Sequence, residues 1–197
     1  MENIIKNFVN ENLNMFKLKC TYEPDDLINL YVEKTDNQYI LVANINTLKK
    51  MNLTDLELEC LLWHEKGHYE LNHLEEKNNY FINIFLMILV GVTGISSIGL
   101  SYFHLNILWM TLAIFLLISY LITDNLLILK KMRKFEYNAD KYACRHCSGK
   151  EFINMLNKLE NFYRPFLEDK RNLAILSTHP PTESRINKII SYHPKIH

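Results

Sequence analysis

The chain has 197 residues, 48% of them hydrophobic, and its 22 basic and 22 acidic residues cancel to a formal net charge of zero. This length suits one compact domain, or one domain with a membrane element. Because no basic surplus would attract phosphate groups, we expect no nucleic-acid partner, and four cysteines are too few for a disulfide scaffold.

The N-terminal part is predicted to contain a helix and a β-hairpin. Residues 1–16 lack the order of charged and apolar residues of a signal peptide, and their apolar residues have the spacing of an amphipathic helix that packs on its own domain. Residues 27–45 are rich in Ile, Leu, Val and Tyr around a polar centre, which is typical of a hairpin. A short helix is expected over 46–51.

A capping box marks the start of the next predicted helix. Thr54 is followed by Glu57 three residues on, so a helix should begin at Thr54 and continue to about Glu76. Glycine within a helix costs about 1 kcal/mol relative to alanine. We therefore expect a tight packing contact at Gly67, which lies inside this helix.

The same helix contains an H-E-x-x-H pattern over residues 64–68. Residues four apart lie on one helical face, so His64 and His68 can bind one zinc ion through their ring nitrogens. Glu65 borders that face, where it can take a proton from the attacking water and pass it on. His73 should point away from this face, and we expect it at the helix end or in solvent rather than on the metal.

Two apolar runs without charged residues follow, over 80–100 and 105–122. As helices rising ~1.5 Å per residue they would be roughly 31 and 27 Å long, close to the ~30 Å hydrocarbon core of a bilayer. They predict a transmembrane helical hairpin with a tight turn over 101–104. The alternative is a pair of core helices in a soluble bundle, but such helices normally keep a polar stripe.

The charges beside these runs predict their orientation. The turn has no Lys or Arg, whereas the segment after the second run has four basic residues, namely Lys130, Lys131, Arg133 and Lys134. By the positive-inside rule, both flanks of the hairpin are cytoplasmic. We therefore predict a cell-membrane protein with two spans, in which both termini and the active site face the cytoplasm.

The third zinc ligand is expected beyond the hairpin, in a helix predicted over 130–147. Glu136 and Asp140 are four apart and share one face of that helix. Glu136 would complete a His₂Glu catalytic site with an open fourth position, and Asp140 would accept the free N–H of a ligand histidine. The alternative is a solvated acidic pair among lysines. The hairpin favours the zinc site, because it returns this helix to the side of the H-E-x-x-H helix.

Cys144 and Cys147 stand three apart at the end of the same helix. A lone C-x-x-C without a partner pair favours buried, reduced thiols over a second metal site, because cysteines three apart share a helical face. Two further helices are expected, one over 151–166 that ends at Pro165 and one that is capped by Thr182.

Three sequence blocks in this order resemble the HtpX-like membrane zinc metallopeptidases, gluzincins related to the type I CAAX prenyl endopeptidases. The blocks are LTDLELECLLWHEKGHYELNH, EYNADKYA and STHPPTESRI. The resemblance implies zinc ligands His64, His68 and Glu136, with Glu65 as general base and acid. It also implies that His179 lies near the tetrahedral intermediate as an oxyanion donor, although a helix-capping role is the alternative.

The fold class that follows is mainly α with a small β-hairpin or sheet (α+β). A zincin-like metallopeptidase domain would be interrupted by the two-helix transmembrane hairpin, with parts at 1–78, 79–124 and 125–197. Arg185, in the last sequence block, is expected to pair with an acidic neighbour and hold that block in place rather than act in catalysis.

The predicted function is that of an integral membrane endopeptidase with one zinc ion (Zn²⁺) per chain. It would hydrolyse peptide bonds of membrane-associated proteins or peptides, which could lie beside the strand over 38–44 as an added strand. One alternative is an antirepressor-type membrane metallopeptidase, although no sensor domain is recognisable. The other is a non-catalytic zinc-binding membrane adaptor, which would need a fourth ligand such as His73 or His179 and would have no use for Glu65.

Overall fold

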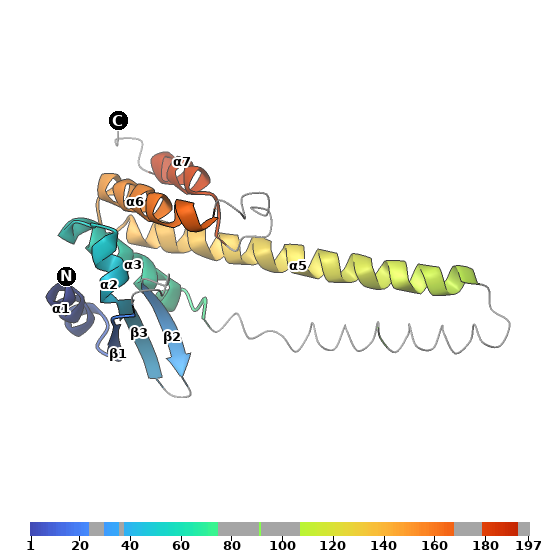
Figure 1. The fold of residues 1–197 in the computed structure, drawn as a ribbon, viewed down its shortest axis with the longest axis horizontal. Helices are drawn as coiled ribbons and strands as arrows, with labels where there is room; N and C mark the ends of the chain where they lie inside the picture. The colour runs from blue at the N-terminus through green and yellow to red at the C-terminus, as the bar shows by residue number, and fades with distance from the viewer. Residues whose placement is uncertain (24–29, 36–37, 75–90, 92–106, 168–178, 193–197) are drawn as a thin grey trace. The chain divides into compact units, whose positions relative to one another are not determined.

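A computed structural model of the chain describes residues 1–23, 30–35, 38–74, 91, 107–167 and 179–192 (Figure 1). By its internal contacts the chain divides into two units. One consists of Met1–Leu74 with Arg133–His197, and the other of Glu75–Met132. The fold is mainly helical with a small mixed sheet.

The sheet has three strands among the described residues, in the order β1-β3-β2 (Figure 1). The predicted hairpin is confirmed, because β2 (Leu30–Thr35) pairs antiparallel with β3 (Gln38–Asn44). Strand β1 (Phe16–Thr21), which was not predicted, pairs parallel with the other edge of β3. The prediction that a peptide adds to the strand over 38–44 is therefore wrong, since both edges of β3 are already paired.

Helix α1 (Glu2–Asn12) packs on this unit through an apolar face, as its amphipathic pattern predicts. Ile5, Phe8 and Val9 are buried, and the Phe8 ring meets the Trp63 ring edge-on at a centroid distance of 5.0 Å. Trp63 lies on α3, so α1 supports the helix that carries the H-E-x-x-H pattern.

Short helix α2 (Ile45–Lys50) precedes α3 (Asp55–Glu70), and both have side-chain caps at their N-termini. The capping box is confirmed: the Thr54 amide donates to Glu57 Oε2 at 2.7 Å, and the Glu57 amide donates to Thr54 Oγ1 at 3.2 Å. The predicted end near Glu76 is wrong. The helix stops at Glu70 because Asn72 has a left-handed backbone with φ of 56°.

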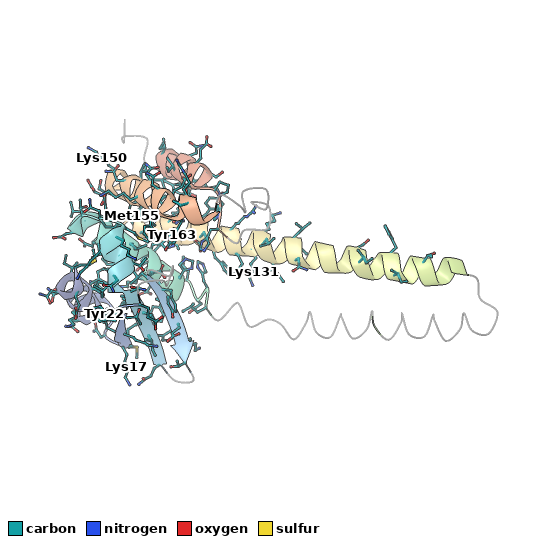
Figure 2. The ribbon with its side chains drawn as sticks, in the orientation of Figure 1. Lys17, Tyr22, Lys131, Lys150, Met155 and Tyr163 are labelled. Atoms are coloured by element: carbon teal, nitrogen blue, oxygen red, sulfur yellow. The ribbon has the colours of Figure 1, made fainter. Side chains whose placement is uncertain are left out.

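The C-terminal helices complete the core of the first unit. Helix α6 (Gly149–Leu167) buries Phe152 and Met155, and it continues past Pro165 instead of ending there. Figure 2 shows Met155 and Tyr163 along this helix. Lys158 of this helix donates to Glu57 Oε2 at 2.6 Å and so ties α6 to the start of α3. Helix α7 (Thr182–Tyr192) begins at Thr182 and buries Ile189 in the same core.

Helix α5 (Ile107–Ala143) is 37 residues long and belongs to both units. Most of the predicted span over 105–122 falls in its first half, whereas the span over 80–100 lies outside the described residues apart from residue 91. None of the helices in the described part of the chain combines the length and hydrophobicity needed to cross a bilayer. The last turns of α5, from Arg133 onward, belong to the unit that contains the site.

Candidate metal centre

Two helices of the first unit present the residues of the candidate site. The H-E-x-x-H residues lie on α3, and Glu136 and Asp140 lie on the C-terminal part of α5. The predicted packing contact at Gly67 is present, since a Cβ built there would lie 3.2 Å from Ala139 Cα and 3.2 Å from Ala139 O. Any other residue at this position would push the neighbouring backbone away by a few tenths of an ångström, so glycine favours the close approach that brings the two halves of the site together.

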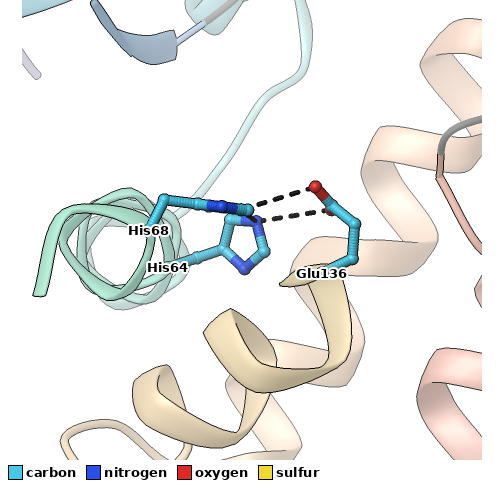
Figure 3. A group of neighbouring side chains, drawn as sticks. All are labelled: His64, His68 and Glu136. Atoms are coloured by element: carbon cyan, nitrogen blue, oxygen red, sulfur yellow. Dashed lines mark hydrogen bonds and ion pairs between the residues drawn. The ribbon is translucent and has the colours of Figure 1, made fainter. Parts of the chain in front are cut away.

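The side chains of His64, His68 and Glu136 converge between these helices (Figure 3). The two Nε2 atoms are 3.2 Å apart, His64 Nε2 is 3.7 Å from Glu136 Oε2, and His68 Nε2 is 3.4 Å from Glu136 Oε1. In a tetrahedral zinc site with bonds of ~2.0–2.1 Å, ligand atoms are separated by about 3.3 Å. The observed spacings therefore fit one zinc ion bound by these three residues.

The charges around the three side chains also favour a cation at this point. Burial opposes ionisation of Glu136, but His179, His64 and His68 outweigh it and hold the pKa of this carboxyl well below its ordinary value. Burial lowers the pKa of His68 to about 3, so this ring is neutral and offers a lone pair. Glu136 Oε2 is buried and accepts no hydrogen bond of good geometry. A buried carboxylate beside a neutral imidazole favours a positive ion at this point.

Asp140 lies behind His64, on the side away from His68. Its Oδ1 is 3.0 Å from His64 Nδ1, so the carboxylate favours a proton on that nitrogen and leaves Nε2 available as a ligand atom. Burial opposes protonation of His64, but Asp140 and Glu136 raise its pKa nonetheless. The surroundings of this ring thus stabilise positive charge.

Arg185 of α7 holds Asp140 in place. Its Nε donates to Asp140 Oδ2 at 2.8 Å and its Nη2 donates to Asp140 Oδ1 at 2.6 Å. Its Nη1 is also 3.8 Å from Glu136 Oε2. The pairing with an acidic neighbour, which the last sequence block suggested, joins α7 to the helix that carries Glu136.

Glu65 and His179 are neighbours of this group. Glu65 follows His64 on α3 and is half-buried. Burial raises the pKa of Glu65 to about 7, although the nearby His64 opposes that rise. His179 Nδ1 is 3.0 Å from Glu136 Oε2, while 68% of the His179 side chain is exposed. Both residues can therefore exchange protons or hydrogen bonds with a molecule that enters the site from solvent.

The expectation for His73 is confirmed in part, because this histidine lies just beyond the end of α3 and is not in the metal group, but it is buried and contacts the site instead of pointing away from it. Its exposure is only 3%, and its Nδ1 lies 3.1 Å from His68 Nδ1. That nitrogen of His68 is the one that faces away from Glu136, so His73 contacts a ligand and not the metal position. Among the described residues, the group that can hold a metal comprises His64, His68 and Glu136, with no fourth side chain.

The cysteines take no part in a metal group within the described part of the chain. Cys144 is buried, Cys147 is half-buried, and both are free thiols. Burial raises the pKa of Cys144 to about 12, which keeps this thiol protonated and unreactive.

Comparisons with known proteins found one matching family and similar solved structures. The sequence profile of peptidase family M48 matches residues 3–193. Solved structures similar to this one include the crystal structure of S. mikatae Ste24p, with a TM-score of 0.68 and 18% sequence identity. That match covers 95% of this chain and 49% of the other, so this chain spans about half the length of that relative. No curated protein matches the sequence. At this level of identity the structural likeness shows a shared fold.

Proposed function

The chain belongs to peptidase family M48. From this premise we propose that it is a zinc metallopeptidase that cleaves membrane-associated proteins or peptides at the cytoplasmic face of the cell membrane. The observation that carries the catalytic part is the convergence of His64, His68 and Glu136, with Glu65 beside them. Three protein ligands leave one zinc position open for water and substrate, as catalytic sites require.

Each residue of the site has a distinct part in the proposed reaction. Zinc, when bound, supplies a Lewis acid that polarises the scissile carbonyl. Glu65 takes a proton from the attacking water and passes it to the leaving amine. A carboxyl group with a pKa of about 7 suits both steps, because it accepts and releases a proton near neutral pH. His179, whose side chain is largely exposed and contacts Glu136, donates a hydrogen bond to the developing oxyanion.

The membrane location is supported by the sequence. Residues 80–100 and 105–122 contain no charged residue, and basic residues follow the second run at 130–134. By the positive-inside rule, these charges keep both parts of the first unit on the cytoplasmic side. A substrate associated with the membrane would meet the site at that surface.

The two alternative functions are less well supported. A purely structural zinc site would be closed by a fourth protein ligand, such as His73 or His179. His73 contacts the far nitrogen of His68, and His179 contacts Glu136 but is not part of the group of described residues that can hold a metal. The match to family M48 over residues 3–193 gives no support to an antirepressor-type peptidase.

Glu65→Gln in the full-length chain tests the proposed reaction. The variant keeps the side-chain shape but cannot accept a proton, so hydrolysis of fluorogenic peptides should fall by at least about 10²-fold. Zinc content should stay near one ion per chain by elemental analysis. Glu70→Gln, the same chemical change at an exposed position of α3, serves as the control and should cleave like wild type.

Cleavage by Glu65→Gln at the wild-type rate would show that Glu65 is not the base. Absence of peptide cleavage by the zinc-loaded wild-type chain would instead favour the non-catalytic adaptor.

A further inference from the structure

His73 is a buried polar residue that the proposed reaction does not use. It is 3% exposed, although it stands beyond the end of α3 at a position where a helix-end histidine would normally meet water. Burial of an imidazole is costly unless its ring nitrogens have partners. Its Nδ1 meets His68 Nδ1 at 3.1 Å, which provides such a partner and connects it directly to a zinc ligand.

The end of α3 has the backbone geometry that brings His73 to this place. The Asn72 amide donates to Tyr69 O at 2.9 Å, and the His73 amide donates to His68 O at 3.0 Å. Together with the left-handed φ of 56° at Asn72, these two bonds form a Schellman motif. The motif reverses the chain, so that the residue after Asn72 folds back over the last turn of the helix, beside His68.

A ring stack holds His73 against the helix that supplies the third ligand. The rings of His73 and Phe135 are nearly parallel, with centroids 4.2 Å apart and an interplanar angle of 14°. Phe135 immediately precedes Glu136 and is itself buried. His73 therefore contacts one ligand through a ring nitrogen and the neighbour of another through its ring face.

The direction of the contact between the two histidines decides whether His68 can bind zinc. If His68 Nδ1–H donates to His73 Nδ1, the Nε2 of His68, which lies 3.4 Å from Glu136 Oε1, carries the lone pair that a zinc ion between the two atoms would need. In the opposite arrangement the proton of neutral His68 would lie on Nε2 and block the metal position. Ligand histidines usually donate their other N–H to a fixed acceptor, and Asp140 Oδ1, 3.0 Å from His64 Nδ1, is positioned for that part beside His64.

We propose that His73 is the corresponding positioning residue for His68: its Nδ1 accepts the His68 Nδ1–H and fixes the tautomer and ring orientation that zinc binding requires. The proposal rests on the zinc site of the proposed function. In this arrangement each ligand histidine has a partner for its second ring nitrogen, the Asp140 carboxylate of α5 for His64 and the His73 imidazole of the turn after α3 for His68.

The test compares His73→Phe with His73→Gln in the full-length chain. Phenylalanine keeps a ring that can stack on Phe135 but has no acceptor, whereas glutamine lacks the ring but offers an amide oxygen to His68. Zinc affinity is measured by competition with a chelator, and cobalt is substituted to record the visible spectrum of the site. We expect zinc affinity to fall by about 10–100-fold in His73→Phe, with an altered cobalt spectrum, and both to return toward wild type in His73→Gln.

A matched control comes from His146, which stacks on Trp63 at a centroid distance of 4.1 Å on the exposed surface. His146→Phe makes the same chemical change away from the zinc site and should leave zinc affinity and the cobalt spectrum unchanged. Thermal unfolding of the metal-free proteins shows whether each variant keeps the fold.

Equal zinc affinity in His73→Phe and wild type would overturn the role of His73. Equal weakening in His73→Phe and His73→Gln would also overturn it, because packing alone would then explain the loss. Failure of the wild-type chain to bind zinc would instead refute the proposed zinc site, on which the role of His73 depends.

Discussion

Glu136 reaches the site from a helix that lies far along the chain from the H-E-x-x-H residues, and it supplies the only negative charge among the three ligands. Its carboxylate contacts both ligand histidines, at 3.7 Å and 3.4 Å. Glu136 therefore neutralises part of the zinc charge, which neither imidazole can do.

Glu136→Ala should accordingly weaken zinc retention sharply while the fold persists. Elemental analysis after dialysis against a weak chelator should show much less than one zinc per chain, compared with about one in wild type. Glu160→Ala, at an exposed position of α6, is the control and should retain zinc. Zinc retention by Glu136→Ala equal to that of wild type would remove Glu136 from the ligand set.

How far the site could be predicted depends on whether each residue obeys a local pattern. His64 and His68 share a face through helical spacing alone, and Glu136 and Asp140 do so on their own helix. His73 does not, because its position depends on the backbone angle of Asn72, and a helix continued past that point would turn His73 away. Asparagine is the commonest residue after glycine in this left-handed position, so the Asn72-His73 pair was the available signal.

At the scale of elements, the start of a helix was easier to predict from the sequence than the end of a helix or the pairing of strands. The capping box at Thr54 and Glu57 is a contact over three residues and is visible in the sequence. Strand β1 alternates apolar and polar residues, yet its parallel pairing with β3 joins segments that are far apart in sequence. Such pairings depend on tertiary packing, which local patterns do not specify.

Gly67 controls the distance between α3 and α5. Alanine at this position would favour the helix by about 1 kcal/mol, but its Cβ would press on the Ala139 backbone at 3.2 Å and require a shift of a few tenths of an ångström. Overpacking of this kind costs about 1–3 kcal/mol. Because α3 carries His64 and His68 and α5 carries Glu136, a shift at this contact would also move the ligands apart.

Gly67→Ala should therefore weaken zinc binding and fail to stabilise the protein despite its better helix propensity. Chelator competition and chemical unfolding measure the two effects. Glu70→Ala, exposed on the same helix, should leave zinc affinity unchanged. Tighter zinc binding together with higher stability in Gly67→Ala would contradict the role of this contact.

The ion pair between Glu57 and Lys158 joins α3 to α6 and should make stability depend on pH. Burial opposes ionisation of Glu57, but Lys158 and the Thr54 amide lower its pKa below the ordinary value. A carboxyl group whose pKa is lowered by folding stabilises the protein above its unfolded pKa of about 4.3, and this contribution is lost as pH falls through the folded value.

Glu57→Gln should thus reduce the free energy of unfolding at pH 7 by about 1–2 kcal/mol, a range that allows for solvent screening at Lys158, which is 35% exposed. Below about pH 4 the difference from wild type should shrink, because Glu57 becomes protonated in both states. Urea titrations at several pH values measure this difference in the free energy of unfolding. Glu160→Gln, in an exposed pair with Arg164, should show almost no effect, and a difference at Glu57 that is independent of pH would contradict this account.

At the scale of the whole molecule, the site belongs to a unit assembled from two separate stretches of chain. Met1–Leu74 and Arg133–His197 together contain every residue of the proposed reaction, whereas Glu75–Met132 contains none. The stack of His73 on Phe135, with centroids 4.2 Å apart, shows that the chain leaves and re-enters this unit at nearly the same place. A short connection could therefore replace the intervening segment without straining the unit.

We predict that replacing residues 75–132 with a flexible Gly-Ser linker of about eight residues leaves a folded zinc protein, because the loop-closure cost of such a linker is small. Since the apolar runs lie in the removed segment, wild type should sediment with membranes and resist a high-salt wash, while the shortened chain should remain in the soluble fraction. Zinc content of both proteins is measured in parallel. A shortened chain that binds zinc but still sediments with membranes would place the attachment outside 75–132, and wild type in the soluble fraction would refute the membrane location. Loss of zinc from a soluble shortened chain would show instead that the segment is needed to assemble the site.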